Sequence, residues 1–353
     1  MSKFLSSRFS FEPYAPGEQP KDMKYLKLNT NESPYPPSRR VQDAVSSEAG
    51  KLNLYSDPES AALRKKAAEL YGVAPENILP VNGSDEALNF AFLAFCDKNI
   101  PIVYPSVSYG FYTVLAGLHG IPSVEIPLTE DFLINPKDYI SLHKNIVIAN
   151  PNAPTGQYMA PDVVETIVRS NPENVVIIDE AYIDFGGETV IPLIKKYPNL
   201  IVTRTFSKSH SLAGARLGFA FANEALIADM DMIKYSTNPY NVNRLTSAAG
   251  IAAMEDNRYY MENCRAVAEV RDDTVLRLRA MGFTVMESKS NFIFVKSAAI
   301  AGGELYRLLR ERGILVRHFT KPLLCDYNRI SIGTKEQMNE VLAAITSIFE
   351  AGR

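Results

Sequence analysis

The hydrophobic pattern divides the chain near residue 245. Between about residues 60 and 222, short and almost wholly apolar runs alternate with amphipathic stretches; the runs are NIVIAN (145–150), NVVIIDE (174–180), LIVTRT (200–205) and RLGFAF (216–221). Strands that are apolar on both faces are typical of parallel sheets with helices on each side. This region therefore predicts a largely parallel sheet covered by helices.

Two of the amphipathic stretches carry helix-start signals. In GSDEALNFAFLAF (83–95), Ser84 is the expected N-cap and acidic residues follow it in the first turn. In APDVVETIVRS (160–170), Pro161 stands at the expected first helical position. Both stretches are predicted to be helices that pack on the sheet.

After about residue 245 the elements become shorter and mixed. A long helix is expected over 257–281, and its apolar face is expected to contain Met261, Cys264, Ala268, Val275 and Leu278. Short strands are predicted at FTVME, NFIFVK, ILVRHF and NRISIG, with helices near 303–312 and 335–350. The pattern predicts an N-terminal arm (1–30) that packs with the small domain or a dimer partner, a large domain (31–245) and a small α+β domain (246–353).

Composition narrows the possible functions. The 353 residues are 46% hydrophobic, which is enough for sizeable cores, and the net charge of −3 without a basic run argues against nucleic acid binding. Three cysteines and four histidines do not occur at metal-ligand spacing, so no metal site is expected. No apolar run approaches the roughly 18 residues of a membrane span. We therefore expect a cytoplasmic protein with no membrane partner.

Asp179 and Glu180 follow the buried run VVII directly. Ligands of open α/β sheets bind beyond the carboxyl ends of the strands, so a carboxylate here is suited to face a positive partner in a half-buried site. A helix cap or a solvated turn explains the same two residues equally well.

Lys208 follows the next apolar run, within TFSKSHSLAGARLGF (205–219). A lone loop lysine is usually solvated. Here Thr205, Ser207 and Arg216 accompany it, and two hydroxyls with a guanidinium suit a phosphate. In such a pocket, desolvation and neighbouring cations favour the neutral amine, which attacks carbonyl carbons.

Four further features have ordinary structural explanations when each is taken alone. VNGSDEAL (81–88) places backbone amides at a helix start, where anions bind, but a capped helix suffices. Tyr109 offers a surface for ring stacking or is a core tyrosine. NPNAPTG (150–156) is turn chemistry. Arg329, which alternates with Ile330 and Ile332, faces either an anion or a surface carboxylate.

Together these segments resemble the fold-type I aminotransferases, which use pyridoxal 5'-phosphate. The resemblance covers nearly the whole chain in order and depends on NGSDE (82–86), PTG (154–156), DEAYIDF (179–185), SK…AR (207–216) and RISIG (329–333). It implies a mostly parallel seven-stranded sheet in a three-layer α/β/α arrangement, a small α+β domain and an N-terminal arm. It also implies ping-pong Schiff-base chemistry between an amino donor and an oxo acceptor.

The resemblance assigns roles to individual residues. Lys208 matches the Schiff-base lysine that moves the substrate's proton, and Asp179 matches the partner of the pyridine nitrogen. Tyr182 matches the tyrosine that bonds the ring hydroxyl, and Tyr109 the stacking aromatic. The phosphate is expected among Ser84, Asp85, Thr205, Ser207 and Arg216. Tyr55 matches a tyrosine that reaches the phosphate of the neighbouring subunit, which implies a homodimer with shared sites.

One position departs from the family pattern. The family usually reads Asn-Pro-Thr-Gly, with that asparagine on the ring hydroxyl, whereas Ala153 stands there in this chain and Asn152 precedes it. Either Asn152 takes this contact through a shifted loop, or Tyr182 makes the contact alone.

Within the family, the closest resemblance is to the histidinol-phosphate aminotransferases of histidine biosynthesis. EPYAPGEQP (12–20), LNTNESPYPPS (28–38), NPYNVNRLTSAA (238–249) and VRHF (316–319) are similar to their segments. This resemblance implies that Arg329 binds the substrate carboxylate and that Tyr14, Asn31 and Arg317 bind substrate, with Tyr14 and Arg317 at its phosphate end.

Other functions remain open at this point. The same scaffold serves aromatic and other amino-acid aminotransferases, and it also serves phospho-amino-acid decarboxylases. Decarboxylation requires the bond to the carboxylate, instead of the bond to the α-hydrogen, to be perpendicular to the cofactor ring. A non-enzymatic sensor is disfavoured because the lysine, aspartate and arginine set is intact. A nucleotide-binding dehydrogenase is disfavoured because no G-x-G-x-x-G occurs.

Overall fold

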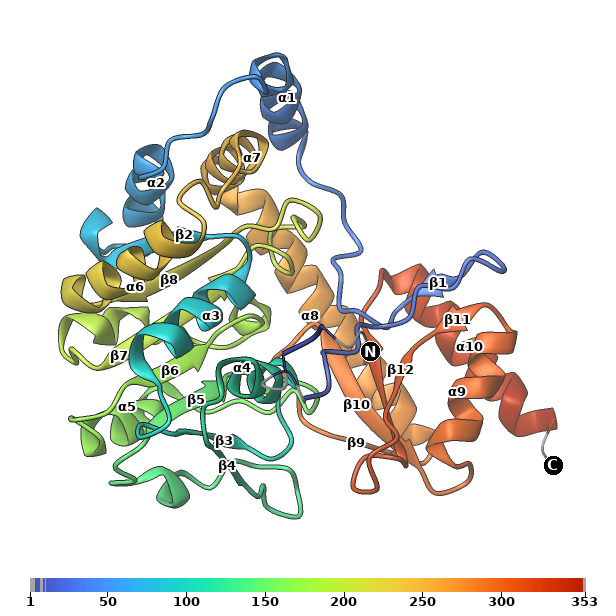
Figure 1. The fold of residues 1–353 in the computed structure, drawn as a ribbon. Helices are drawn as coiled ribbons and strands as arrows, with labels where there is room; N and C mark the ends of the chain where they lie inside the picture. The colour runs from blue at the N-terminus through green and yellow to red at the C-terminus, as the bar shows by residue number, and fades with distance from the viewer. Residues whose placement is uncertain (1–3, 7–8, 10, 352–353) are drawn as a thin grey trace.

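The computed structural model describes residues 4–6, 9 and 11–351; residues 1–3, 7–8 and 10 of the expected arm, and 352–353 of the expected small domain, lie outside them. Its main sheet has seven strands (Figure 1). Their order is β2 (Ile78–Val81), β8 (Gly218–Ala222), β7 (Leu200–Thr205), β6 (Val176–Asp179), β5 (Asn145–Ala149), β3 (Ile102–Pro105) and β4 (Ser123–Ile126). The pairs of β8 with β2 and β7 are antiparallel and the other four pairs are parallel, so the prediction of a mostly parallel sheet is confirmed.

Helices cover both faces of this sheet. Along β5, Ile146 and Ile148 face one apolar cluster with α1 (Arg39–Glu48), α2 (Ala61–Tyr71), α5 (Pro161–Ser170) and α7 (Arg244–Glu255). Val147 and Ala149 face the other cluster, with α3 (Ser84–Phe95), α4 (Phe111–His119) and α6 (Glu224–Thr237). Alternate residues of one strand therefore enter two cores, which explains the wholly apolar runs. Short 3₁₀ turns complete this part: η1 (Ala49–Lys51), η2 (Pro75–Asn77), η3 (Pro136–Tyr139), η4 (Ile183–Phe185) and η5 (Ile191–Lys195).

The predicted start of α3 is wrong by one residue. Gly83 occupies the N-cap position with φ of 80°, and Ser84 is the first helical residue. Glycine suits this position because L side chains rarely adopt a φ of 80°, and a Cβ here would also lie close to the Arg216 guanidinium. The expected start at Pro161 is confirmed in α5.

The C-terminal part forms a smaller antiparallel sheet with helices packed against it (Figure 1). Its strand order is β12 (Arg317–His318), β13 (Tyr327–Ser331), β10 (Phe292–Ser297) and β9 (Phe283–Val285). The helices are α8 (Asn257–Ala280), α9 (Gly302–Glu311) and α10 (Lys335–Ala351). The strand expected over 314–319 is divided, because β11 (Ile314–Leu315) leaves the sheet to pair with β1 (Leu26–Lys27). The boundary expected between residues 245 and 246 falls within α7 and stays a prediction.

The buried face of α8 differs in part from the expected one. Cys264 and Leu278 are buried as predicted, but Ala268 and Val275 are only partly buried. Arg271 lies between Ala268 and Val275 on the buried side of α8. Its guanidinium donates to the carbonyls of Phe185 and Ser290. A polar residue thus occupies a core position because it satisfies two buried carbonyls.

The N-terminal segment connects the two sheets. Strand β1 pairs in parallel with β11, and the Glu18 carboxylate accepts a hydrogen bond from Tyr306 on α9. After β1, residues 28–38 lead to α1 (Figure 1). Residues 30 and 31 approach the carboxyl ends of the large-sheet strands.

A buried ion cluster lies behind these strand ends. Arg204 of β7 is 4% exposed, and its guanidinium contacts Glu180 at 3.2 Å and Asp184 at 2.5 Å. It also lies over the ring of Tyr71 at 5.4 Å. Glu180 and Asp184 flank the turn after β6, so this cluster holds the segment that contains Tyr182.

Arg204→Met is expected to destabilise the protein by about 3–5 kcal/mol, because it leaves two carboxylates buried without a cation. Urea unfolding of the cofactor-free chain measures this loss. Arg307→Met is the matched control, since Arg307 pairs with Glu304 and Glu311 on an exposed face. Loss of these exposed ion pairs should change the urea concentration at the unfolding midpoint little. Similar unfolding curves for the two variants would contradict a stabilising role for the Arg204 cluster.

Candidate active site

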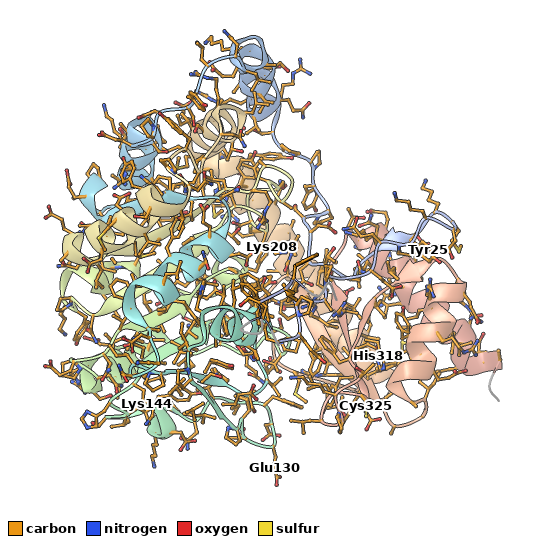
Figure 2. The ribbon with its side chains drawn as sticks, in the orientation of Figure 1. Tyr25, Glu130, Lys144, Lys208, His318 and Cys325 are labelled. Atoms are coloured by element: carbon orange, nitrogen blue, oxygen red, sulfur yellow. The ribbon has the colours of Figure 1, made fainter. Side chains whose placement is uncertain are left out.

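Lys208 lies in the turn after β7, between the two sheets (Figure 2). Its amine donates to the carbonyl of Thr30 at 3.0 Å and lies 5.9 Å from the ring of Tyr182. Burial lowers the pKa of the Lys208 amine to about 8, and Arg329 adds to this shift. An appreciable fraction of the amine is therefore neutral near neutral pH, the form that attacks a carbonyl.

Asp179 ends strand β6 and is 3% exposed. Its carboxylate accepts hydrogen bonds from the hydroxyls of Tyr112 and Thr203, each at 3.0 Å. Burial raises the pKa of Asp179 to about 6, while these two hydrogen bonds oppose the rise. The strand end therefore holds a buried carboxylate that is mainly ionised at neutral pH.

Arg216, Thr205 and Ser207 form a polar cluster at the end of β7. The Arg216 guanidinium donates to Ser207 Oγ at 3.3 Å, and Thr205 Oγ1 donates to the same oxygen at 3.0 Å. Thr205 and Ser207 are buried, whereas the side chain of Arg216 is 44% exposed. Arg216 has a positive φ of 57°. A guanidinium with two hydroxyls is a donor set suited to a phosphate.

Two glycines bring the start of α3 against this cluster. A Cβ at Gly83 would lie 2.5 Å from Arg216 Nη2, and one at Gly218 would lie 2.6 Å from the amide nitrogen of Ser84. Without side chains at these positions, the N-terminal amides of α3 reach the arginine and the hydroxyls. Helix N-termini attract anions, so this arrangement forms a cradle for a phosphate.

Asp85 connects this cradle to the aromatic surface. One of its oxygens accepts from the Tyr109 hydroxyl at 2.9 Å, and the other lies 3.1 Å from Arg216 Nη2. Tyr14, from the N-terminal segment, meets Tyr109 and Phe111 edge-on, with ring centroids 5.9 Å apart in each pair. The structure thus brings the predicted stacking tyrosine beside the predicted phosphate site.

Asn31 and Tyr182 lie on the other side of Lys208. The Asn31 side-chain amide donates to the Tyr182 hydroxyl at 3.0 Å, and its side-chain oxygen accepts from Ser331 at 2.9 Å. Asn31 has a φ of 57°, a conformation that asparagine tolerates better than most residues. Asn31 therefore joins the N-terminal segment, the turn after β6 and the end of β13.

Asn152 is buried, and its side chain is fully engaged by its own loop and by the loop after β3. Its amide nitrogen donates to Val107 O at 3.0 Å and Thr155 Oγ1 at 2.9 Å, and its oxygen accepts from Ser108 at 2.9 Å. Both amide hydrogens are thus in use, which favours the alternative in which Tyr182 contacts the ring hydroxyl without Asn152. Ala153 offers no polar side-chain group at the usual position.

Arg317 and Arg329 are cross-strand neighbours in the small sheet, on β12 and β13. Arg329 donates to the carbonyl of Asn29 at 2.9 Å, while its Nε is buried without a partner. Arg317 donates to the carbonyl of Pro16 at 3.3 Å. Burial lowers the pKa of Arg329, and the charge of Arg317 adds to this effect. Like charges placed opposite each other are unfavourable unless an anion lies between them.

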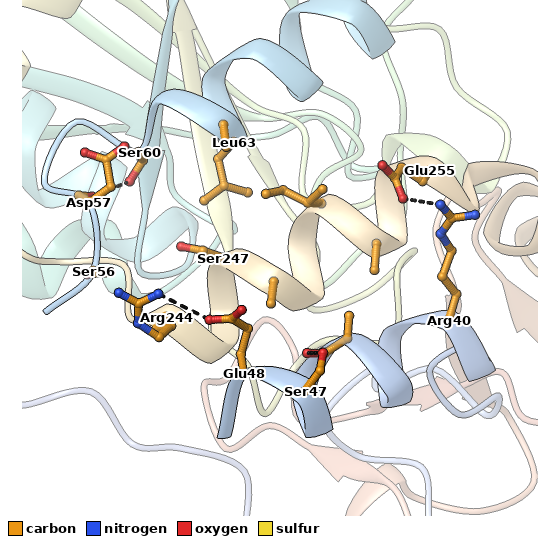
Figure 3. A pocket seen from close by; sticks show the side chains of 15 residues that line it. Arg40, Ser47, Glu48, Ser56, Asp57, Ser60, Leu63, Arg244, Ser247 and Glu255 are labelled. Atoms are coloured by element: carbon orange, nitrogen blue, oxygen red, sulfur yellow. Dashed lines mark hydrogen bonds and ion pairs between the residues drawn. The ribbon is translucent and has the colours of Figure 1, made fainter. Parts of the chain in front are cut away.

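Tyr55 lies apart from these residues, on the segment between η1 and α2. Its side chain is 79% exposed and stacks on Tyr240, with ring centroids 4.6 Å apart. Arg244 donates to the Tyr55 carbonyl at 2.8 Å and also lines an open cavity of about 400 Å³ between α1 and α7 (Figure 3). Two ion pairs, Arg40–Glu255 and Arg244–Glu48, join α1 to α7 at this cavity. None of the predicted cofactor ligands lines it.

Other kinds of site receive no support from the described residues. In residues 4–6, 9 and 11–351, no group of three His, Cys, Asp or Glu side chains is placed to hold a metal ion. Within the same residues, no helix combines the length and apolar character needed to cross a membrane.

The profile of the aminotransferase class I and II family matches residues 23–345. The chain belongs to this family. The match includes the lysine, the aspartate, the phosphate cradle and both arginines of the site described above. The membership predicted from SK…AR, DEAYIDF and the accompanying segments is therefore confirmed.

Relatives in this family resemble the chain over nearly its whole length. It is 49% identical to a histidinol-phosphate aminotransferase of Brachyspira hyodysenteriae, over 99% of this chain and 100% of the relative. It is 45% identical to histidinol-phosphate aminotransferase 1 of Hydrogenovibrio crunogenus, over 99% of each. The crystal structure of the Sinorhizobium meliloti histidinol-phosphate aminotransferase with pyridoxal-5'-phosphate aligns with a TM-score of 0.86 at 26% identity, over 94% of this chain and 92% of that chain.

Sequence reasoning did not identify Tyr112, Thr203 or the side-chain role of Asp85. Tyr112 is in the first turn of α4 and follows Tyr109, which precedes the helix, by three residues. Thr203 precedes Thr205 by two residues on a strand, so both face the same side of the sheet. These spacings are the available signals, but neither specifies a partner without the fold.

Proposed function

We propose that this aminotransferase interconverts imidazole acetol phosphate plus glutamate and histidinol phosphate plus 2-oxoglutarate, in histidine biosynthesis, with pyridoxal 5'-phosphate as cofactor. The relatives named above support this substrate pair. The observation that carries the proposal is the Arg317–Arg329 cross-strand pair, with an unpartnered Nε on Arg329. Two guanidiniums suit the dianionic phosphate of one substrate and the carboxylate of the other.

The residues of the site fit pyridoxal 5'-phosphate. Arg216, Thr205, Ser207 and the amides at the start of α3 would hold its phosphate, in the cradle that a Cβ at Gly83 would fill. The position of Asp179 suits the pyridine nitrogen, that of Tyr182 the ring hydroxyl and that of Tyr109 the ring face. Bound in this way, the cofactor supplies an electron sink for the electrons released when the substrate's α-carbon loses its proton.

The chain's own residues perform binding and proton transfer. The Lys208 amine, with a pKa of about 8, is suited to form the bond to the cofactor and later to move the proton at the substrate's α-carbon. Asp179 holds a proton on the ring nitrogen by remaining ionised beside it. Arg329 and Arg317 orient the substrate by its anionic groups, and Tyr14 covers the site from the N-terminal segment.

Half-reactions with several amino donors test this proposal. Purified protein loaded with pyridoxal phosphate should react with histidinol phosphate at a kcat/KM well above its values for phenylalanine and aspartate. Stopped-flow absorbance of the bound cofactor follows each half-reaction directly. A preference for phenylalanine would favour an aromatic aminotransferase instead, and release of CO2 would favour a decarboxylase.

We also propose that two chains form a homodimer with shared active sites. Leu52, Leu54, Tyr55 and Tyr240 are 58%, 57%, 79% and 44% exposed, and the first three lie on one segment. Exposed apolar side chains gathered in this way are typical of a protein–protein interface. Arg244 fixes the backbone of this segment, so Tyr55 is presented outward toward a second chain.

Mixing two variants, each altered in one of the shared residues, tests the shared site. Tyr55→Phe chains mixed with Lys208→Ala chains should recover up to about a quarter of wild-type activity, because half of the dimers are mixed and each has one intact site. In the control, Lys208→Ala chains are mixed with chains that contain both substitutions, and no recovery is expected. Recovery no greater than that of Tyr55→Phe alone would refute a contribution of Tyr55 across the interface.

We further propose a cytoplasmic location. The three cysteines, Cys96, Cys264 and Cys325, are all free, and two of them are buried. Free thiols persist in a reducing compartment, which agrees with this location.

A further inference from the structure

The carboxylate of Asp179 is held by two hydroxyl groups that have no role in the proposed function above. The Tyr112 hydroxyl donates to Oδ2 and the Thr203 hydroxyl donates to Oδ1, both at 3.0 Å. Asp179 is 3% exposed, and Tyr112 and Thr203 are 0% exposed. These two hydroxyls are therefore the side-chain donors that set the orientation of the carboxylate.

Both donors are rigidly placed by the fold. Thr203 is the Cα partner of Asp179 in the pairing of β6 with β7, so the sheet register fixes its hydroxyl beside the carboxylate. Tyr112 lies on α4, and its ring packs against Tyr104 at 5.9 Å and edge-on against Tyr109 at 5.7 Å. Tyr112 therefore connects the predicted stacking tyrosine to the predicted partner of the ring nitrogen.

We propose that Tyr112 and Thr203 are positioning residues that hold Asp179 ionised and in one orientation toward the pyridine nitrogen of the cofactor. This inference rests on the proposed use of pyridoxal phosphate. A hydroxyl that donates to a carboxylate stabilises its charged form. The two hydroxyls and the backbone amide of Ala181 together use three of the four lone pairs of the carboxylate, which leaves one for the protonated ring nitrogen.

The ionisable groups around Asp179 come from three neighbouring elements. Tyr112 faces it from α4, Asp85 from α3 and Tyr182 from the turn after β6. Burial raises the pKa of Asp179 to about 6, the charge of Asp85 raises it further, and the hydrogen bonds from Tyr112 and Thr203 lower it. Removal of either donor should therefore raise this pKa and leave more of the carboxyl group neutral near pH 7.

The test measures the affinity of the cofactor-free chain for pyridoxal phosphate as a function of pH. In the wild type, affinity should fall as the pH decreases through about 6, because the neutral carboxyl group no longer pairs with the protonated ring. Tyr112→Phe and Thr203→Val should each move this midpoint upward by about one pH unit, which weakens binding by about twofold at pH 7 and by up to about tenfold below pH 6. Absorbance titration gives both quantities without a turnover assay.

Tyr104→Phe is the matched control. Tyr104 is 3% exposed, packs in the same aromatic cluster and donates its hydroxyl to Thr113 at 3.1 Å instead of to Asp179. The Tyr104→Phe variant loses a hydroxyl from the same aromatic cluster. The pH midpoint of its affinity for pyridoxal phosphate should therefore equal that of the wild type.

Each possible result decides the inference. The positioning role would be overturned if the variants bound more weakly at every pH with an unchanged midpoint. Equal shifts in Tyr104→Phe and Tyr112→Phe would also overturn it, because both results indicate that the side chains only contribute packing. If the wild type binds pyridoxal phosphate and neither Tyr112→Phe nor Thr203→Val shifts the midpoint, only this inference fails. If the wild type does not bind pyridoxal phosphate, both this inference and the proposed function fail. Thr203→Val decides the question if Tyr112→Phe does not fold.

Discussion

Lys208→Ala is expected to lower kcat by about four orders of magnitude or more, since the variant lacks both the nucleophilic amine and the group that moves the α-carbon proton. Cofactor binding should persist, because Arg216, Thr205 and Ser207 do not depend on the lysine. Borohydride reduction followed by mass spectrometry should label the wild-type chain with the cofactor at Lys208 and leave the variant unlabelled.

Lys208→Arg is the control for charge. It keeps a cation beside Thr30 and Tyr182 but does not supply a neutral amine, since the guanidinium stays protonated. We expect it to be as inactive as Lys208→Ala. Substantial turnover by either variant, or cofactor labelling at another lysine in the wild type, would show that Lys208 is not the nucleophile.

Arg317→Ala is expected to lower kcat/KM for histidinol phosphate by about 10- to 100-fold. A charge-assisted hydrogen bond contributes about 1.5–3 kcal/mol, and the substrate phosphate would lose such contacts. Phenylalanine and aspartate, which lack a phosphate, should be affected much less. Half-reaction rates for the three donors, measured on the same preparation, give the selectivity directly.

Two further variants separate charge from geometry at this position. Arg317→Lys keeps the cation and should retain part of the selectivity, although it loses the planar, bidentate donor set. Arg312→Ala removes an arginine whose guanidinium donates to Leu308 O on the surface of α9, and it should leave the three rates unchanged. If Arg317→Ala slowed all three donors equally, its assignment to the substrate phosphate would be wrong.

Much of the secondary structure followed from periodicity alone. The runs at 145–150, 174–180 and 200–205 became β5, β6 and β7, because strands between two layers of helices are apolar on both faces. The long helix predicted over 257–281 is α8 (Asn257–Ala280). Two expectations were wrong. A long-range contact explains the first, because β11 leaves the strand expected over 314–319 to pair with β1. The second is local, because the N-cap of α3 is Gly83 with φ of 80° instead of Ser84.

The candidate site was predicted as separate segments. Family resemblance identified Lys208, Asp179 and Arg216, and the structure places them at neighbouring strand ends. The resemblance could not indicate that Asp85 lies between Tyr109 and Arg216, or that the side chain of Asn152 is engaged by Val107 and Ser108. These contacts join residues that are far apart in the sequence, and side-chain identity does not determine which partner is in reach.

The sequence by itself determined the chemical groups of this protein: a lysine among hydroxyls, a carboxylate after a buried strand and arginines on short strands. It determined the layered α/β architecture as well, because hydrophobic periodicity reflects which faces must leave water. The tertiary structure alone decided how these groups act on one another. The pairing of β6 with β7 sets Thr203 against Asp179, and the pairing of β12 with β13 sets Arg317 against Arg329. Burial lowers the pKa of Lys208 and the charge of Arg329 adds to this shift, while the strand register places two guanidiniums where an anion between them is favourable.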